Sequence, residues 1–468
     1  MAHDSDSRHL PNLTHLRRKA MVVGLRAWRE MESTARSALG AELRPSLPRE
    51  DLHALREQME SCLDAKGGDI SARARTAELG QTYLALNAQG RSRFLRLLAG
   101  FDITRAKLDA AIASYQKTGN EAPLREAMIS PRSIILRQFT ALPNGFKFLV
   151  DMRADLLPLT HKDHRLKGLD QDMKAILSSW FDIGLLDLAQ ITWNSPAALL
   201  EKLMEYEAVH QIRSWDDLKN RLDADRAIYA FFHNKMPLEP LIFVQVAFVH
   251  GLSDNIQKLL DTESPVFDIE KADTAIFYSI SNAQKGLAGI SFGNFLIKRV
   301  VAELTRDYKQ IKTFATLSPV PGFRAWLDAQ LARGEMPFAE PSELRMICNL
   351  AGEKNAPRAL QALLASDWHK DKKTAEALQP VLMRQCVHYL TEEKKDGRPL
   401  DPVAAFHLFN GARLEKINWL ADTSPKGMKQ SCGIMVNYHY KLSEIDDNHE
   451  EFAASGKIVA SRQVRGYL

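Results

Sequence analysis

The hydrophobic pattern of the chain changes near Trp180, and this change limits the folds that the chain can adopt. Before Trp180, apolar residues recur at spacings of three and four, as in "NLTHLRRKAMVVGLRAWREMESTARSAL" and "SRFLRLLAGFDITRAKLDAAIASYQKTG". This spacing is typical of amphipathic helices, and strand-like runs are nearly absent there. After Trp180, runs rich in Ile, Val and Phe appear. Because 468 residues are too many for one ordinary core, we expect two domains or more.

Two apolar runs in the second part of the chain predict a β-hairpin. They are "AIYAFFH" (227–233) and "LIFVQVAFVH" (241–250), and prolines bound the turn between them. The stretch that precedes them, residues 185–209, has helical spacing, so we expect a helical transition there.

A βαβ unit is predicted further along the chain. "TAIFYSISN" (274–282) and "IKTFATLS" (311–318) read as strands, and "GNFLIKRVVAELTRDY" (293–308) between them reads as an amphipathic helix. Helical patterns return after Pro321. The predicted fold class is therefore α+β, with an all-α bundle over residues 1–181 and an α/β domain over 182–468.

Composition excludes several classes of protein. The net charge of +4 is small for this length, and no block of Lys and Arg with interleaved aromatic residues suggests nucleic-acid binding. The four scattered cysteines indicate neither a zinc site nor a disulfide framework. The longest apolar run, residues 240–252, is shorter than a membrane helix requires. With no apolar secretory signal and no peroxisomal ending, we expect a cytoplasmic protein.

Ser318 stands in an unusual setting, "TFATLSPVPGF" (313–323). Because proline follows it, Ser318 is pushed out of the helical region and held extended, and Pro321-Gly322 then favours a turn. Ser318 is either an ordinary turn residue or a hydroxyl that is held in a fixed position for chemistry.

The turn between the first strand and the helix of the βαβ unit is rich in glycine, "QKGLAGISFGNFLIKRV". Glycines allow backbone amides to approach a ligand, and amides at the start of a helix attract phosphate. The turn resembles the pyrophosphate loop of GNAT-like acyl-CoA transferases, although Ala288 and Ser291 stand where that family prefers a polar residue and a glycine. An ordinary tight turn is the alternative.

His407 and a pair of tyrosines are the other candidates for chemistry. His407 lies in "AAFHLFNGARL", where it is either a buried histidine bonded to a carbonyl or a general acid or base. In "CGIMVNYHYKL", strand alternation sends Tyr438 and Tyr440 to one face and His439 to the other. A serine and a histidine with no evident acid partner fit hydrogen bonding or proton transfer better than a hydrolase triad.

Several long stretches resemble the malonyl-CoA decarboxylase family, over most of the chain up to about residue 460. They are "SPRSIILRQF", "NGFKFLVDMRADLL", "AIFYSIS", "GNFLIKRVVAEL", "TLSPVPGF", "DPVAAFHLFNGARLEKINWLAD" and "SCGIMVNYHY". The resemblance implies a helical N-terminal domain followed by a GNAT-like catalytic domain. It places the catalytic serine on Ser318, the catalytic histidine on His407 and an active-site tyrosine on Tyr440. The malonyl-CoA loop falls on Ala288, Gly289, Ile290, Ser291, Phe292, Gly293 and Asn294.

The implied reaction is the loss of CO2 from malonyl-CoA to give acetyl-CoA, as part of fatty acid metabolism. The thioester already contains an electron sink, so we expect no metal and no organic cofactor. The family also suggests a homo-oligomer, possibly a tetramer, with neither nucleic acid nor membrane as a partner. Two rival functions remain: an acetyl-CoA-dependent acyltransferase with the same loop, and a helical protein that senses acyl-CoA without converting it.

Overall fold

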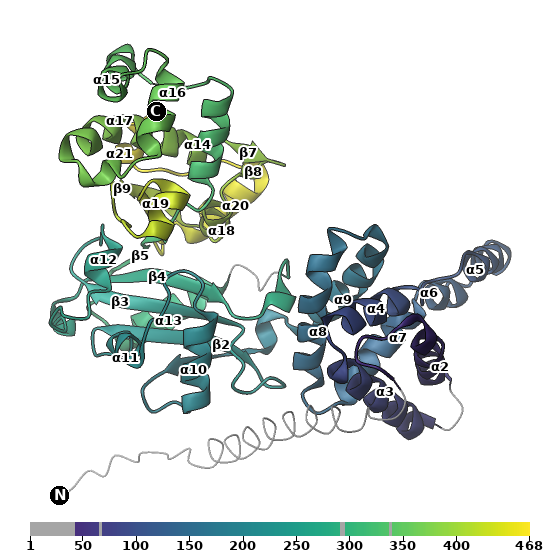
Figure 1. Ribbon diagram of the computed structural model, residues 1–468. Coiled ribbons are helices and arrows are strands. Elements are labelled where there is room, and N and C mark those ends of the chain that lie inside the picture. The colour runs from purple at the N-terminus through teal and green to yellow at the C-terminus, as the bar shows by residue number, and fades with distance from the viewer. Residues whose placement is uncertain (1–42, 65–67, 291–294, 337–338) are drawn as a thin grey trace, which may run out of the picture. The chain divides into compact units, whose positions relative to one another are not determined.

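The structure is a computed structural model that describes residues 43–64, 68–290, 295–336 and 339–468 (Figure 1). The chain forms two compact units. The first contains residues 1–187, 231–241 and 282–292, and the second contains residues 188–230, 242–281 and 293–468. None of the described helices is both long and apolar enough to cross a membrane.

The first unit is helical, as the spacing of its apolar residues predicts. Its core contains the aromatic side chains of Tyr83, Phe94 and Phe148, which pack edge to face with ring centroids 4.9 and 5.7 Å from Tyr83. The helices are α2 (Leu52–Leu63), α3 (Gly68–Ala85), α4 (Ala88–Ala99), α5 (Arg105–Thr118), α6 (Ala122–Ala127), α7 (Pro131–Gln138), α8 (Gly145–Thr160) and α9 (Lys167–Trp180).

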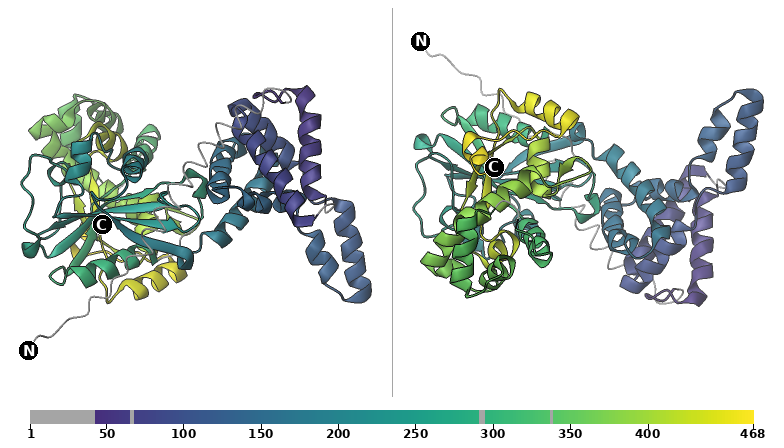
Figure 2. Two further views of the ribbon diagram at one scale, coloured as in Figure 1. Left: turned by 90° about the horizontal axis from the view of Figure 1, so that it is seen from below. Right: turned by 90° about the horizontal axis from the view of Figure 1, so that it is seen from above.

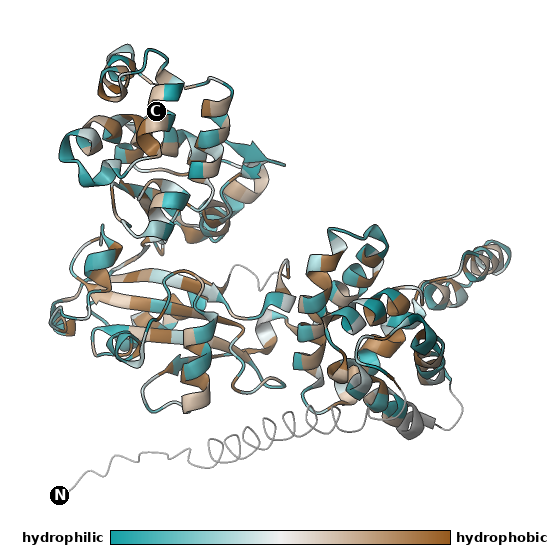
Figure 3. Ribbon diagram, in the orientation of Figure 1, coloured by the Kyte–Doolittle hydropathy of each residue, from teal (hydrophilic) through white to brown (hydrophobic). Residues whose placement is uncertain are grey.

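A mixed sheet forms the centre of the second unit, in the order β1-β2-β3-β4-β5-β10-β6, with β9 also paired to β10. Its central strands β3 and β4 are buried along almost their whole length, which explains their continuous apolar sequences; they appear mostly brown in Figure 3. The strands are β1 (Leu186–Ile191), β2 (Arg226–His233), β3 (Ile242–Val249), β4 (Thr274–Asn282), β5 (Thr313–Thr316), β6 (Ser318–Pro319), β9 (Arg413–Asn418) and β10 (Met435–His439).

Helices lie on both faces of this sheet (Figure 2). The helices of the second unit are α10 (Ala197–Tyr206), α11 (Trp215–Asn220), α12 (Ile256–Leu259), α13 (Phe295–Asp307), α14 (Phe323–Ala332), α15 (Pro341–Ala351), α16 (Ala356–Leu364), α17 (Lys372–Thr391), α18 (Pro402–Phe409), α19 (Pro425–Ser431), α20 (Ile445–Ser455) and α21 (Arg462–Arg465). A separate pair of short strands is formed by β7 (Lys394–Lys395) and β8 (Arg398–Pro399).

The predicted βαβ unit is confirmed. Strands β4 and β5 pair in parallel, with Ile276 opposite Ala315, and α13 connects them. The strand-like runs 227–233 and 241–250 form the neighbours β2 and β3, as the hairpin prediction requires. The fold class is therefore α+β, as predicted.

One element was predicted wrongly. Residues 186–191 lie within the stretch expected to be helical, yet they form β1, at the edge of the sheet. This stretch is short and has few apolar residues, so its pattern fits the period of 3.6 residues of a helix as well as the period of two of a strand. Its pairing with β2 therefore decides its structure.

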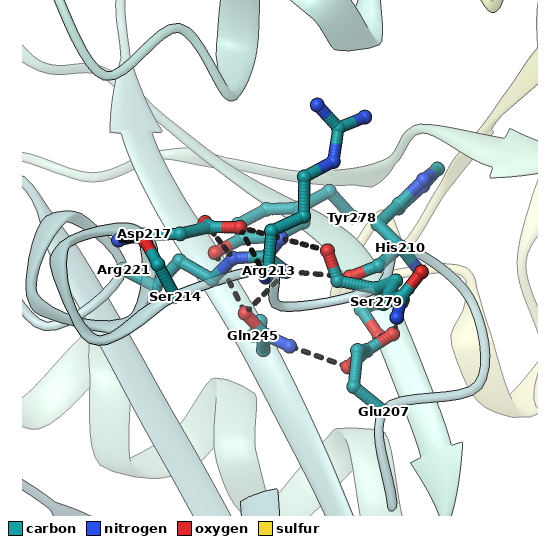
Figure 4. A network of polar contacts seen from close by, with 10 residues as sticks. Glu207, His210, Arg213, Ser214, Asp217, Arg221, Gln245, Tyr278 and Ser279 are labelled. Atoms are coloured by element: carbon teal, nitrogen blue, oxygen red, sulfur yellow. Dashed lines mark hydrogen bonds and ion pairs between the residues drawn. The ribbon is translucent and has the colours of Figure 1, made fainter. Parts of the chain in front are cut away.

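A buried carboxylate fastens the segment after α10 to the sheet (Figure 4). Glu207 accepts hydrogen bonds from the backbone N–H groups of Val209 and His210, both at 2.8 Å. It also accepts from the hydroxyl of Ser279 on β4 and from the amide of Gln245 on β3. Because donors from the segment itself and from two strands all bond to the Glu207 carboxylate, the network stabilises a single position of this segment.

Candidate active site

Ser318 lies where the chain passes from β5 into β6. It pairs with Val436 of β10, and its side chain is buried. The extended backbone is the one predicted for a residue before proline. The turn that follows is closed by a hydrogen bond from the N–H of Phe323 to the carbonyl of Val320, and α14 starts at Phe323.

Four buried side chains form one chain of hydrogen bonds around Ser318. The Ser318 hydroxyl donates to Oγ1 of Thr316 at 2.9 Å, and its Oγ lies 3.0 Å from Nε2 of His407. Nδ1 of His407 in turn lies 2.7 Å from the hydroxyl of Tyr440. The structure thus brings together the three residues predicted to be catalytic, although 89 residues separate the serine from the histidine.

Burial keeps His407 and Tyr440 uncharged in this chain of hydrogen bonds. It lowers the pKa of His407 to about 3 and raises the pKa of Tyr440 well above its ordinary value. A neutral phenol donates readily, so we assign the Tyr440 hydroxyl as the donor to Nδ1. The remaining imidazole proton then lies on Nε2 and faces Ser318.

Asp401 fixes the helix that carries His407. Its carboxylate caps α18 by accepting from the N–H groups of Val403 and Ala404 at 3.0 and 2.9 Å. It also accepts from the N–H of Gly322, at 3.4 Å, in the turn after Ser318. Burial raises the pKa of Asp401 to about 6, against the opposing effect of these N–H donors. One carboxylate therefore connects the serine turn and the histidine helix.

Tyr438 and His439 lie as strand alternation predicts. The ring of Tyr438 stacks on His407 with centroids 4.6 Å apart and planes 25° from parallel. His439 points elsewhere and lies 3.7 Å from the Glu415 carboxylate. The Tyr438 hydroxyl is buried and finds no hydrogen-bond partner among the described residues, so its ring, and not its hydroxyl, contacts the candidate site.

The glycine-rich loop is described as far as Ile290. Residues 287–290 form a turn closed by the N–H of Ile290 on the carbonyl of Leu287. Gly289 has φ of +73°, as the third position of a type II turn requires. Four further residues predicted to bind malonyl-CoA lie outside the described residues: Ser291, Phe292, Gly293 and Asn294.

Sequence reasoning missed Thr316 and Asp401. Thr316 stands two residues before Ser318 on an extended segment, which predicts a shared face. The pair Asp401-Pro402 is a typical helix start, with a capping carboxylate before a proline at the first helical position. Both signals were available, but neither one identifies a partner elsewhere in the chain.

The described part of the chain contains no group of three or more His, Cys, Asp or Glu side chains that could hold a metal ion. All four cysteines are free, and three of them are buried.

Comparison with known proteins gives the family. The malonyl-CoA decarboxylase C-terminal domain matches residues 184–468, and the N-terminal domain of the same name matches residues 101–181. Mitochondrial malonyl-CoA decarboxylase of Rattus norvegicus is 36% identical over 97% of this chain and 95% of its own length. The protein of that name from Anser anser anser is 43% identical over 73% of this chain and 70% of its own.

A solved structure gives the same result. The crystal structure of malonyl-CoA decarboxylase from Rhodopseudomonas palustris covers 89% of this chain and 99% of its own, with a TM-score of 0.82 and 40% identity. Together with the fold and the buried serine–histidine pair, these matches define a carboxy-lyase. The chain belongs to the malonyl-CoA decarboxylase family.

The comparisons overturn the predicted location. The curated relatives from goose, rat and mouse are all named as mitochondrial proteins, so the cytoplasmic prediction is wrong. It rested on the lack of an apolar secretory signal and of a peroxisomal ending. A mitochondrial transit peptide is amphipathic and rich in Arg and Ser, so neither observation could exclude it.

Proposed function

We propose that Ser318, His407 and Tyr440 catalyse the decarboxylation of malonyl-CoA to acetyl-CoA and CO2, and that Ala288 to Asn294 form the loop that binds the coenzyme A part. The continuous hydrogen-bonded chain from Ser318 to Tyr440 supports the catalytic assignment. Membership of the family supports the choice of substrate.

The substrate supplies most of the chemistry. The malonyl carboxylate is β to a thioester carbonyl, so the electrons of the breaking C–C bond flow into that carbonyl and form an enolate. This requires the C–C bond to lie perpendicular to the plane of the thioester. The protein has to fix that conformation, stabilise the enolate oxygen and deliver a proton, and none of these tasks requires a resident metal or organic cofactor.

His407 is the proton donor in this proposal. It is neutral in the free protein because burial lowers its pKa to about 3. A malonyl carboxylate that binds beside it raises the pKa, since an opposite charge favours the imidazolium. His407 therefore gains one proton on Nδ1 with the substrate, and the Tyr440 hydroxyl then accepts from Nδ1 instead of donating to it. After CO2 leaves, His407 gives its Nε2 proton to the enolate carbon, and the Tyr440 hydroxyl donates to Nδ1 again once the neutral imidazole is restored. The proton balance closes, because the overall reaction consumes one proton.

Ser318 and Tyr440 orient the histidine and the substrate. The Ser318 hydroxyl accepts from Nε2 of His407 and donates to Thr316 in the free protein. On substrate binding it turns its proton from Thr316 to the carboxylate or to the developing enolate oxygen. A donor in that place is worth about a hundred- to a thousandfold in rate. Tyr440 holds the imidazole by its other nitrogen, so that the nitrogen near Ser318 carries the proton.

We further propose that the protein is a homo-oligomer, possibly a tetramer, built through its helical region, and that it acts in fatty acid metabolism. Large apolar side chains exposed in the described part of that region support an interface between copies: Ile112, Tyr115, Met128, Ile129 and Ile134.

The catalytic assignment is tested by steady-state kinetics of variants at Ser318 and His407. Ser318→Ala is expected to lower kcat by about a hundred- to a thousandfold and to leave the Kd for coenzyme A unchanged. His250→Ala is the matched control for His407→Ala, because His250 is exposed and pairs only with Asp273 among the described residues. Turnover by Ser318→Ala within threefold of wild type would exclude the role proposed for the serine.

A further inference from the structure

A buried arginine of the helical region holds the described part of the glycine-rich loop. The side chain of Arg153, on α8, is 2% exposed. Its Nη1 donates to the carbonyl oxygens of Gly286 at 2.7 Å and of Ala288 at 2.9 Å, while its Nε donates to Asp170 of α9 at 2.8 Å. The loop residues and both helices belong to the same compact unit. Two carbonyls bonded to one buried guanidinium have little freedom to move.

Close packing adds a second constraint on the loop. A Cβ atom on Gly286 would lie 1.8 Å from the carbonyl oxygen of Val150 on α8, so no other residue fits there without a shift of the backbone. The loop therefore lies directly against α8, and α8 determines its shape.

These contacts determine the direction of the Gly289 amide. The carbonyl of Ala288 and the N–H of Gly289 belong to one trans peptide and point in opposite directions. Because Arg153 holds the carbonyl, the N–H points away from Arg153. Gly289 is exposed, and its N–H has no acceptor among the described residues. The turn thus presents a free donor to solvent.

Lys174 lies beside this donor. Its Nζ is 3.5 Å from the place that a Cβ atom on Gly289 would occupy. Among the described residues, apart from the chain neighbours of Gly289, only the lysine side chain comes within 4 Å of that place. Lys174 is exposed and stands one helical turn after Asp170 on α9. It forms no hydrogen bond or ion pair with any of the described residues. An unpaired ammonium group next to a free backbone N–H is a favourable arrangement for a phosphate group.

We propose that Lys174 and the Gly289 N–H bind the diphosphate of coenzyme A, with Arg153 as the residue that positions the loop. This rests on the proposed function, since it concerns the same loop. It adds a substrate-binding cation from the helical region, whose expected role is to scaffold and to form oligomers. The ligand class is a nucleoside diphosphate. Its negative charge is the same whichever acyl group the thioester carries.

The first test is the affinity for coenzyme A, measured by titration calorimetry. Lys174→Ala is expected to raise the Kd by about tenfold, the usual scale for one hydrogen bond to a charged group. The control is Lys167→Ala, which removes an exposed lysine about 10 Å earlier on the same helix and should leave the Kd unchanged. A Kd for Lys174→Ala within twofold of wild type would overturn the proposal. If wild type binds coenzyme A but does not decarboxylate malonyl-CoA, the proposed function fails, while this test remains valid.

Substrate analogues identify the group that Lys174 contacts. With malonyl-CoA, Lys174→Ala should raise KM about tenfold and leave kcat unchanged. The same penalty is expected with malonyl-dephospho-CoA, which keeps the diphosphate but lacks the 3′-phosphate. It should vanish with malonyl-pantetheine, which has neither. A penalty that disappears with the dephospho substrate, or persists with the pantetheine one, contradicts the assignment to the diphosphate.

The positioning role of Arg153 has its own signature. Arg153→Met should raise KM for malonyl-CoA more than it lowers kcat, and Arg153→Lys should recover part of the affinity because its ammonium group can still donate to a loop carbonyl. A merely structural role would lower the amount of folded protein and leave KM unchanged. If Arg153→Met does not fold, the exposed Lys174 still tests the proposal.

Discussion

The hydrogen bond between Tyr440 and His407 permits a sharp prediction, because the chain supplies its own control. Tyr440 and Tyr438 are both buried and both contact the imidazole of His407. Of the two tyrosine hydroxyls, only that of Tyr440 forms a hydrogen bond with the imidazole. Tyr440→Phe therefore removes a hydrogen bond, whereas Tyr438→Phe removes a hydroxyl that has no partner among the described residues.

The expected magnitude follows from burial. Tyr440→Phe leaves Nδ1 of His407 without a partner in a fully buried site, which costs about 1–3 kcal/mol. We expect the free energy of unfolding to fall by about that amount. Because the imidazole loses the group that selects its tautomer, kcat should fall by about ten- to a hundredfold, which corresponds to about 1.4–3 kcal/mol. Tyr438→Phe should leave kcat within about threefold of wild type and stabilise slightly, since it removes a buried unsatisfied hydroxyl.

Three measurements check this prediction. Acetyl-CoA formation gives kcat, urea unfolding gives stability, and ¹⁵N NMR of labelled histidine gives the tautomer directly. Wild type and Tyr438→Phe should carry the His407 proton on Nε2, and Tyr440→Phe should show a mixture. The reasoning is refuted if Tyr440→Phe keeps wild-type turnover and the wild-type tautomer, or if Tyr438→Phe is the more damaging change.

Three further predictions concern stability. The pKa of Asp401 is raised to about 6 from 3.8, so its contribution to the free energy of unfolding is fully present below pH 4 and is lost as the pH rises through about 6. Over that range, the free energy of unfolding of wild type should fall by about 3 kcal/mol relative to that of Asp401→Asn. An equal dependence on pH in the two proteins, measured by urea unfolding, would contradict this. Glu207→Gln replaces one carboxylate oxygen by an NH2 group, which faces the N–H and O–H donors that Glu207 accepts from. The free energy of unfolding should therefore fall by about 2–3 kcal/mol. An unchanged midpoint of urea unfolding would contradict the stabilising role of these hydrogen bonds. Gly411→Ala places a Cβ 2.1 Å from the carbonyl oxygen of Ile445 at φ of +80°, whereas a Cβ on Gly251, at φ of +69°, meets nothing within 4 Å. The first variant should therefore be clearly less stable than Gly251→Ala, which loses only about 1–2 kcal/mol, and equal thermal midpoints would show that α20 moves away at little cost.

The local parts of the site were predictable from the sequence, whereas its long-range parts were not. Pro319 restricts Ser318 to an extended backbone, and alternation separates His439 from the two tyrosines, so both features follow from neighbouring residues. The hydrogen bond from Ser318 to His407 joins positions 89 residues apart, and only the resemblance to a family linked them. Nothing in the spacing of the sequence indicates that Lys174 lies next to Gly289, because that contact depends on how α8 and α9 pack against the loop.

Strand β1 shows the opposite case, in which local sequence misleads. Residues 186–191 have too few apolar positions to separate a period of two from one of 3.6, and their pairing with β2 at the edge of the sheet decides the outcome. The predicted division at residues 181 and 182 stays a prediction.

The central claim is that this chain releases CO2 from malonyl-CoA by means of the Ser318–His407 pair. The most direct measurement is incubation of the purified protein with malonyl-CoA alone, without metal or amine, followed by mass spectrometry of the thioester. Wild type and His250→Ala should convert malonyl-CoA to acetyl-CoA at equal rates, and His407→Ala should be slower by at least about a hundredfold. Unchanged malonyl-CoA in the wild-type sample, or equal rates in wild type and His407→Ala, would contradict the claim.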